Sequence, residues 1–127
     1  MGWEVWFYQS VRGDSPIEAF LDDLPLKARA KCIAYLEALE EHGFELPRSF
    51  IAKLRGNIWE LRPEWAGTEY RLFYVAMVGR RFVVLHAITK KSQKVKAKDI
   101  ELAEARHNEV IERWHHETTP PIRPRTE

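Results

Sequence analysis

The sequence from Ile58 to Lys91 contains three runs, IWELRP (58–63), YRLFYV (70–75) and FVVLHAITKK (82–91). Each run is rich in β-branched and aromatic residues, and its hydrophobic residues recur with a period of two. Short breaks, one of them at Gly79, separate the runs. This pattern is typical of strands joined by tight turns, so it predicts a three-stranded antiparallel meander.

Charged side chains in these runs are expected on one face of the sheet. Successive residues of a strand point to opposite faces, so Glu60 and Arg62 share a face opposite Trp59. Arg71 joins them if the next strand returns alongside, and Lys90-Lys91 lie where the last strand leaves the sheet. This combination of cations with a carboxylate suits a phosphate-rich ligand. The alternative is a ladder of ion pairs between strands, worth a few tenths of a kcal/mol.

The rest of the chain predicts helices around this sheet. Residues 3–8 alternate like a strand, Pro16 suits the first turn of a helix, and Gly43 is a typical helix stop. Helices are expected over residues 16–24, 26–42 and 98–116. The order β-α-α-β-β-β-α predicts an α+β fold, with a helical hairpin and a C-terminal helix packed on one side of a small antiparallel sheet. Residues 1–116 are expected to form one domain, and 117–127 a flexible tail with three prolines.

Composition limits the class of protein. A chain of 127 residues with 45% hydrophobic and 31% charged residues is typical of one globular domain. No apolar run approaches the roughly 20 residues of a membrane helix, and the first residues lack the pattern of a signal peptide. The single cysteine, Cys32, fits a reducing compartment. We therefore expect a cytoplasmic protein without a membrane partner.

Charge is distributed unevenly although the net charge is only +1. Residues 1–52 carry 5 basic and 9 acidic side chains, and residues 99–127 carry 4 and 7. Residues 53–98 carry 11 basic and 3 acidic side chains, a local excess of +8. Such a basic segment favours polyanions and indicates nucleic acid, although lysines near sheet edges also discourage aggregation.

Other common chemistries find no support in the sequence. The five histidines have no cysteine or carboxylate partner at ligand spacing, so no metal and no other cofactor is expected. His107 falls within the apolar stripe of the last helix, and His86 alternates with apolar neighbours, so both are interpreted mainly as packed residues. No glycine-rich phosphate loop and no serine nucleophile motif is present.

Phosphodiester cleavage without a metal is the chemistry that remains. Cleaving RNA in this way needs a base for the 2′-hydroxyl proton, an acid for the leaving 5′-oxygen and cations for the charge on phosphorus oxygens. The five residues expected to supply these groups are Glu60, Arg62, Arg71, Lys90 and Lys91. On the pattern alone, a structural ion-pair ladder remains an equal interpretation.

Two longer segments carry a family resemblance. KLRGNIWELR (53–62), followed by YRLFY (70–74), resembles the signature of RelE/HigB-like toxins. LHAITKKSQK (85–94) and IELAEAR (100–106) resemble the phage-derived branch of that superfamily. The resemblance covers about residues 3–112. At the start of the last helix, however, Val95-Lys96 stands where the branch usually has Thr-Pro.

The resemblance implies a toxin of a type II toxin–antitoxin system that cuts mRNA on the translating ribosome and is neutralised by a cognate antitoxin. It implies that Arg71 is the phosphate-binding catalytic arginine and that Lys90 and Lys91 are the basic residues at the strand end. Glu60 and Arg62 match the Glu-Leu-Arg of the branch. The basic residues of the flanking motifs are expected to bind RNA; they are Lys53, Arg55 and Lys94.

Two other functions remain open at this stage. Relatives with the same fold inhibit DNA gyrase by binding to it without chemistry, and a basic domain can also bind RNA without cleaving it. Fold alone does not distinguish these functions. The number of cations expected on one face favours the nuclease.

Overall fold

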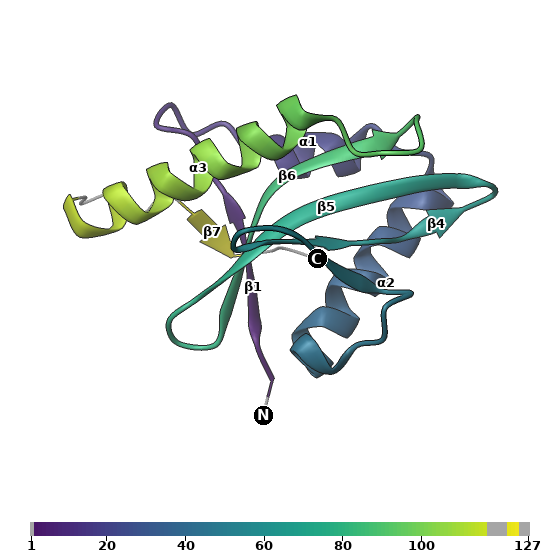
Figure 1. The fold of residues 1–127 in the computed structure, drawn as a ribbon, viewed down its shortest axis with the longest axis horizontal. Helices are drawn as coiled ribbons and strands as arrows, with labels where there is room; N and C mark the ends of the chain where they lie inside the picture. The colour runs from purple at the N-terminus through teal and green to yellow at the C-terminus, as the bar shows by residue number, and fades with distance from the viewer. Residues whose placement is uncertain (1, 117–121, 125–127) are drawn as a thin grey trace.

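The computed structural model describes residues 2–116 and 122–124 and shows an α+β fold (Figure 1). Its sheet has the strand order β2-β3-β5-β6-β1-β7, with the short β4 paired to β5. The elements are β1 (Glu4–Tyr8), α1 (Pro16–Asp22), α2 (Leu26–His42), the 3-10 turn η1 (Gly43–Glu45), β2 (Ile51–Arg55), β3 (Ile58–Leu61), β4 (Glu64–Trp65), β5 (Thr68–Met77), β6 (Arg81–Lys90), α3 (Ala97–His116) and β7 (Ile122–Pro124). The predicted fold class and the predicted meander β3-β5-β6 are therefore confirmed.

The sheet is mixed, whereas the sequence predicted an antiparallel one. β5 and β6 form a long antiparallel hairpin, and β3 and β2 continue it in antiparallel fashion. β1, however, lies parallel to β6, with Val5 opposite Phe82 and Phe7 opposite Val84. Residues 9–80, which include the helical hairpin and the strands β2 to β5, provide the long connection that a parallel neighbour needs. Residues 51–55, which precede the predicted meander, form the edge strand β2.

Helices cover both faces of the sheet, so the prediction that they pack on one side was wrong. Aromatic contacts place α1 and η1 on the first face, where Phe20 meets Tyr70 and Phe44 meets Phe82. On the opposite face, His86 of β6 contacts Asp99 of α3, and the Tyr8 hydroxyl of β1 donates a hydrogen bond to Glu109. In Figure 1, α2 and α3 accordingly lie on opposite sides of the strands.

One part of the core lies between the sheet and the helical hairpin, and another lies under α3, where Ala103 and Val110 are fully buried. Ala28, Cys32, Leu36 and Leu39 of α2 are fully buried, at the spacing of one helical face. They meet the apolar face of the strands, where Leu72, Tyr74 and Phe82 are also fully buried. Burial raises the pKa of the Cys32 thiol to about 12, so this cysteine is a packing residue. A tightly packed core holds the strands, and hence the polar groups on the other face, in fixed positions.

The segment predicted as a flexible tail is described only in part. Its residues 122–124 form β7, which pairs antiparallel with β1, with Phe7 opposite Arg123. Residues 117–121 and 125–127 lie outside the described residues, so the flexible tail remains a prediction there. Within the part of the chain that the structure describes, no helix is long and apolar enough to cross a membrane.

Gly43 ends α2 as predicted, and its conformation gives a test of the fold. Its φ of +56° and ψ of −131° are unfavourable for other residues, and an added Cβ would lie 2.5 Å from Nε1 of Trp3. We expect Gly43→Ala to lower the free energy of unfolding by about 2–4 kcal/mol, through backbone strain and overpacking.

Gly56→Ala is the matched control. Gly56 has a φ of +57°, but an added Cβ there would meet no heavy atom within 4 Å. Only the backbone penalty applies, so we expect a loss of about 1 kcal/mol. Urea unfolding of both variants measures the difference, and equal losses would contradict the packing of Trp3 on Gly43.

Candidate active site

Five charged side chains lie close together on the sheet face that packs against α3. They lie past the N-terminal end of that helix. They are Glu60, Arg62, Glu69, Arg71 and Lys90, and we call them the arginine–carboxylate cluster. The strand register brings them together, because Glu60 lies opposite Phe73, and Glu69 lies opposite Lys90. Glu69, Arg71 and Phe73 alternate along β5, so they share the face of Glu60. The predicted grouping of Glu60, Arg62, Arg71 and Lys90 is thus observed as a structural arrangement.

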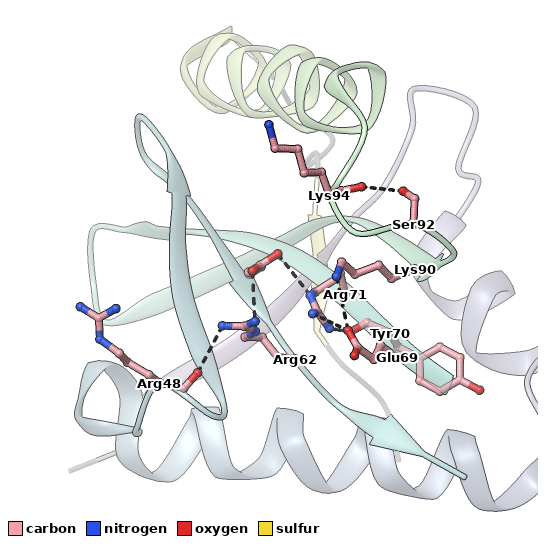
Figure 2. Close-up of polar contacts among 9 residues, drawn as sticks. Arg48, Arg62, Glu69, Tyr70, Arg71, Lys90, Ser92 and Lys94 are labelled. Carbon is pink, nitrogen blue, oxygen red and sulfur yellow. Dashed lines mark hydrogen bonds and ion pairs between the residues drawn. The ribbon is translucent and has the colours of Figure 1, made fainter. Parts of the chain in front are cut away.

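Arg71 is at the centre of the cluster and is almost fully buried, with a side-chain exposure of 4%. One of its guanidinium nitrogens, Nη2, donates to Oε1 of Glu69 at 2.8 Å, and the other, Nη1, donates to the carbonyl of Tyr70 at 2.9 Å (Figure 2). Its Nε lies 3.4 Å from Oε1 of Glu60. Three contacts therefore fix the plane of the guanidinium. This rigidity suits a group that must meet a phosphate in one orientation.

The pKa values of the two carboxyl groups, Glu60 and Glu69, are shifted in opposite directions. The Glu60 side chain is 9% exposed, and Nε of Arg62 lies 3.8 Å from its Oε2. No described residue donates a hydrogen bond to Oε1 of Glu60. Burial raises the pKa of Glu60 above its usual range, although Arg71 and Arg62 oppose that shift.

Glu69 is 46% exposed, and hydrogen bonding from Arg71 together with the charge of Lys90 lowers the pKa of its carboxyl. Two nearby carboxyl groups with pKa values pushed apart are typical of sites that transfer protons. In such a pair, Glu60 takes up a proton more readily, whereas Glu69 stays ionised.

The end of β6 opens onto two pockets. Lys90 is the last residue of β6, and its Nζ lies 3.4 Å from Oε1 of Glu69. A pocket of about 420 Å³ is lined by Gly67, Glu69, Lys90, Lys91, Ser92 and Gln93. A second pocket, of about 200 Å³, lies between the strand end and the first turn of α3 and also includes Lys94, Lys96 and Lys98 in its lining. The predicted residues Lys90, Lys91 and Lys94 therefore line the pockets at the end of β6.

Two of the predicted RNA-binding residues lie elsewhere. Lys53 is on the opposite face of the sheet, where its ammonium lies 5.9 Å from the centre of the Trp59 ring. It lines a separate pocket with Phe44 and Arg48. Arg55 shares the face of the cluster, but both its Nε and its Nη2 donate to the Glu104 carboxylate of α3. The structure therefore brings neither side chain to the pockets at the end of β6.

Sequence reasoning missed two carboxylates. Glu69 is two residues before Arg71, so the period of two in a strand places it on the same face, and the sequence contained that signal. Asp99 had no such signal, because its contact with His86 depends on how α3 docks. Oδ1 of Asp99 lies 2.8 Å from Nε2 of His86, and both side chains are more than 80% buried. This pair ties the first turn of α3 to β6 next to the smaller pocket.

Within the described residues, no group of three or more histidine, cysteine, aspartate or glutamate side chains could hold a metal ion. The site offers cations and carboxylates instead. Three cations and two carboxylates leave one formal positive charge in the cluster, and the exposed lysines of residues 91–98 add to it. Such a site can bind an anion, stabilise negative charge that develops on it and exchange a proton through a buried carboxyl group.

A comparison with known families shows the family to which the chain belongs. The family model described as phage-derived protein Gp49-like (DUF891) matches residues 19–108, which include the whole cluster. The chain belongs to this family of Gp49-like phage-derived proteins, a family associated with RelE-like toxins. No curated protein sequence matches the chain significantly.

Proposed function

We propose that this protein is the toxin of a type II toxin–antitoxin module and cleaves mRNA on the translating ribosome. The observation that carries the proposal is the convergence of Arg71, Arg62 and Lys90 with two carboxylates beside a lysine-rich strand end. Membership of a family associated with RelE-like toxins supports it.

The proposed reaction is attack of a ribose 2′-oxygen on the adjacent phosphorus. A bond forms between that oxygen and phosphorus, and the bond to the leaving 5′-oxygen breaks. The 2′-hydroxyl loses its proton and the 5′-oxygen gains one, giving a 2′,3′-cyclic phosphate and a 5′-hydroxyl. Arg71 and Lys90 stabilise the negative charge on the phosphorus oxygens in the transition state. Glu60 orients the guanidiniums of Arg71 and Arg62, which lie 3.4 and 3.8 Å from its carboxylate oxygens. The reaction as proposed uses side chains and no cofactor.

The proposed partners are the ribosome with its mRNA and an antitoxin. Residues 90–98 carry five lysines and no acidic residue. An acidic segment of an antitoxin would fit this surface, because opposite charges steer association and fix the register of a complex. It would also cover the pockets at the end of β6.

We expect cleavage to depend on translation. The cluster carries only one formal charge in excess, so its affinity for free RNA should be weak and should fall with salt. Purified protein should therefore cut naked mRNA poorly and cut the same mRNA strongly in a reconstituted translation reaction. Primer extension measures both rates. Equal rates with and without ribosomes would contradict the proposal.

An RNA-binding assay and a DNA-supercoiling assay, run beside the cleavage reactions, separate the other candidate functions. RNA binding without cleavage in either reaction would indicate an RNA-binding module. Intact mRNA combined with inhibited DNA supercoiling would indicate a gyrase inhibitor. The convergence of cations and carboxylates on one sheet face favours the nuclease over both, because neither function requires that arrangement.

A further inference from the structure

Glu69 makes a contact that a phosphate group would make. Its Oε1 receives a hydrogen bond from Nη2 of Arg71 at 2.8 Å and another from Nζ of Lys90 at 3.4 Å. Figure 2 shows Glu69, Arg71 and Lys90 meeting at this point. A carboxylate oxygen held between a guanidinium and an ammonium occupies the position that a phosphodiester oxygen would need in order to reach the same two cations.

The two carboxylates on Arg71 differ in how easily they can leave. The Glu60 side chain is 9% exposed, whereas the Glu69 side chain is 46% exposed. Glu69 also lines the pocket of about 420 Å³, together with Lys91 and Ser92. An incoming anion can therefore reach Glu69 from solvent, and its side chain has room to rotate away.

The neighbouring strand adds a second reason for displacement. In the β4–β5 pair, Glu64 lies directly opposite Glu69. Like charges directly opposite each other across two strands are destabilising. Arg71 and Lys90 hold Glu69 at this position, and the charge of Glu64 across the strands would favour its release once a competing anion occupies the two cations.

We propose that Arg71 and Lys90 form a phosphate-binding site that Glu69 occupies in the free protein, and that a phosphate group of the ligand displaces Glu69. This inference deepens the proposed function, on which its assignment to RNA rests. Glu69 acts as an internal competitor. It weakens binding of free phosphate and free RNA, so that substrate delivered at high local concentration on the ribosome is favoured.

Removing the competing charge tests the proposal. Glu69→Gln keeps the shape of the side chain and removes its charge, so binding of anions between Arg71 and Lys90 should tighten roughly tenfold, which corresponds to about 1.4 kcal/mol. Two probes are titrated by calorimetry at fixed low salt: inorganic phosphate, and a single-stranded oligoribonucleotide that 2′-O-methylation protects from cleavage. Neither titration depends on catalysis, so a failure of the proposed nuclease activity does not affect the result.

Glu104→Gln is the matched control. It makes the same change of charge on a carboxylate that, like Glu69, accepts two hydrogen bonds. Both of these come from Arg55, which lies away from the pocket. Its affinity for both probes should stay within twofold of the parent. A second variant, Glu69→Asp, keeps the charge but shortens the side chain, so it should tighten binding less than Glu69→Gln does.

Each outcome decides the inference. Tighter binding of both probes by Glu69→Gln, with an unchanged control, supports it. Tighter binding of inorganic phosphate alone supports the site but overturns its assignment to RNA. Unchanged or weaker binding of both probes overturns the proposal and makes Glu69 a structural partner of Arg71. If Glu69→Gln does not fold, unchanged or weaker binding by Glu69→Asp overturns it equally.

Discussion

Arg71→Ala is expected to lower the rate of ribosome-dependent cleavage by on the order of 100–1000-fold, the usual effect of removing one electrostatic donor from a transition state. Arg71 is the central cation of the cluster and has the most constrained geometry, with contacts to Glu60, Glu69 and the Tyr70 carbonyl. Arg71→Lys should also be severely impaired. Lysine keeps the charge but loses the planar guanidinium that can hold two phosphate oxygens. Single-turnover cleavage on stalled ribosomes measures both variants.

Burial of Arg71 requires a control for folding. Replacing Arg71 leaves the buried Glu60 carboxylate with only the more distant Arg62. Breaking a buried ion pair lowers the free energy of unfolding by roughly 3–5 kcal/mol. Rates must therefore be compared at equal folded fractions, measured by urea unfolding. Arg113→Lys makes the same conservative change at another buried arginine, near the far end of α3. It should leave the cleavage rate within threefold. A folded Arg71→Lys variant within threefold of the parent would show that the site is misplaced.

The second large effect concerns Glu60. We expect Glu60→Gln to reduce cleavage on the order of tenfold and to leave the acidic limb of the pH–rate profile in place. Loss of a general base costs roughly 100–10,000-fold and removes that limb. The structure supports the smaller effect, because the Glu60 carboxylate is buried between two guanidiniums that it can orient. Loss of the acidic limb in this variant would identify Glu60 as the base instead.

The difference in the free energy of unfolding between the parent and Glu60→Gln should depend on pH, and the pKa of Glu60 gives the direction of that dependence. Burial raises the pKa of Glu60 in the folded protein above its ordinary value of 4.5. Between these two pKa values the folded state binds more protons than the unfolded state, so the free energy of unfolding falls as pH rises. Relative to Glu60→Gln, the parent should therefore be most stable below pH 4.5 and lose that advantage as pH increases. The opposite slope would mean that the attraction of Arg71 and Arg62 outweighs burial.

Much of the fold follows from local patterns. The period of two between Ile58 and Lys90 predicted the meander, while Pro16 predicted the start of α1 and Gly43 the end of α2. These signals arise within one element and its immediate neighbours. The parallel contact of β1 with β6 has no local signal, because it depends on where the helical hairpin returns the chain. The position of α3 on the opposite face has the same origin, since one apolar stripe fits either side of a sheet.

The candidate site was also predictable only in part: the shared face of its residues was predictable, and their contacts were not. Alternation along the strands placed Glu60, Arg62 and Arg71 on one face, and the structure shows these three together. Alternation cannot show which partners a long side chain chooses. Arg55 was expected to bind RNA, yet it contacts Glu104, 49 positions further along the chain. The burial of Arg71 between two carboxylates was likewise not predictable, because it depends on the packing of the whole face.

The claim that this cluster cuts mRNA during translation is tested most directly by mapping mRNA 5′ ends in cells after brief induction. The parent protein should produce new 5′ ends inside translated reading frames, and folded Arg71→Lys at the same protein level should produce few of them. Identical 5′-end maps for the parent and the variant, or cuts in untranslated RNA as often as in reading frames, would contradict the account.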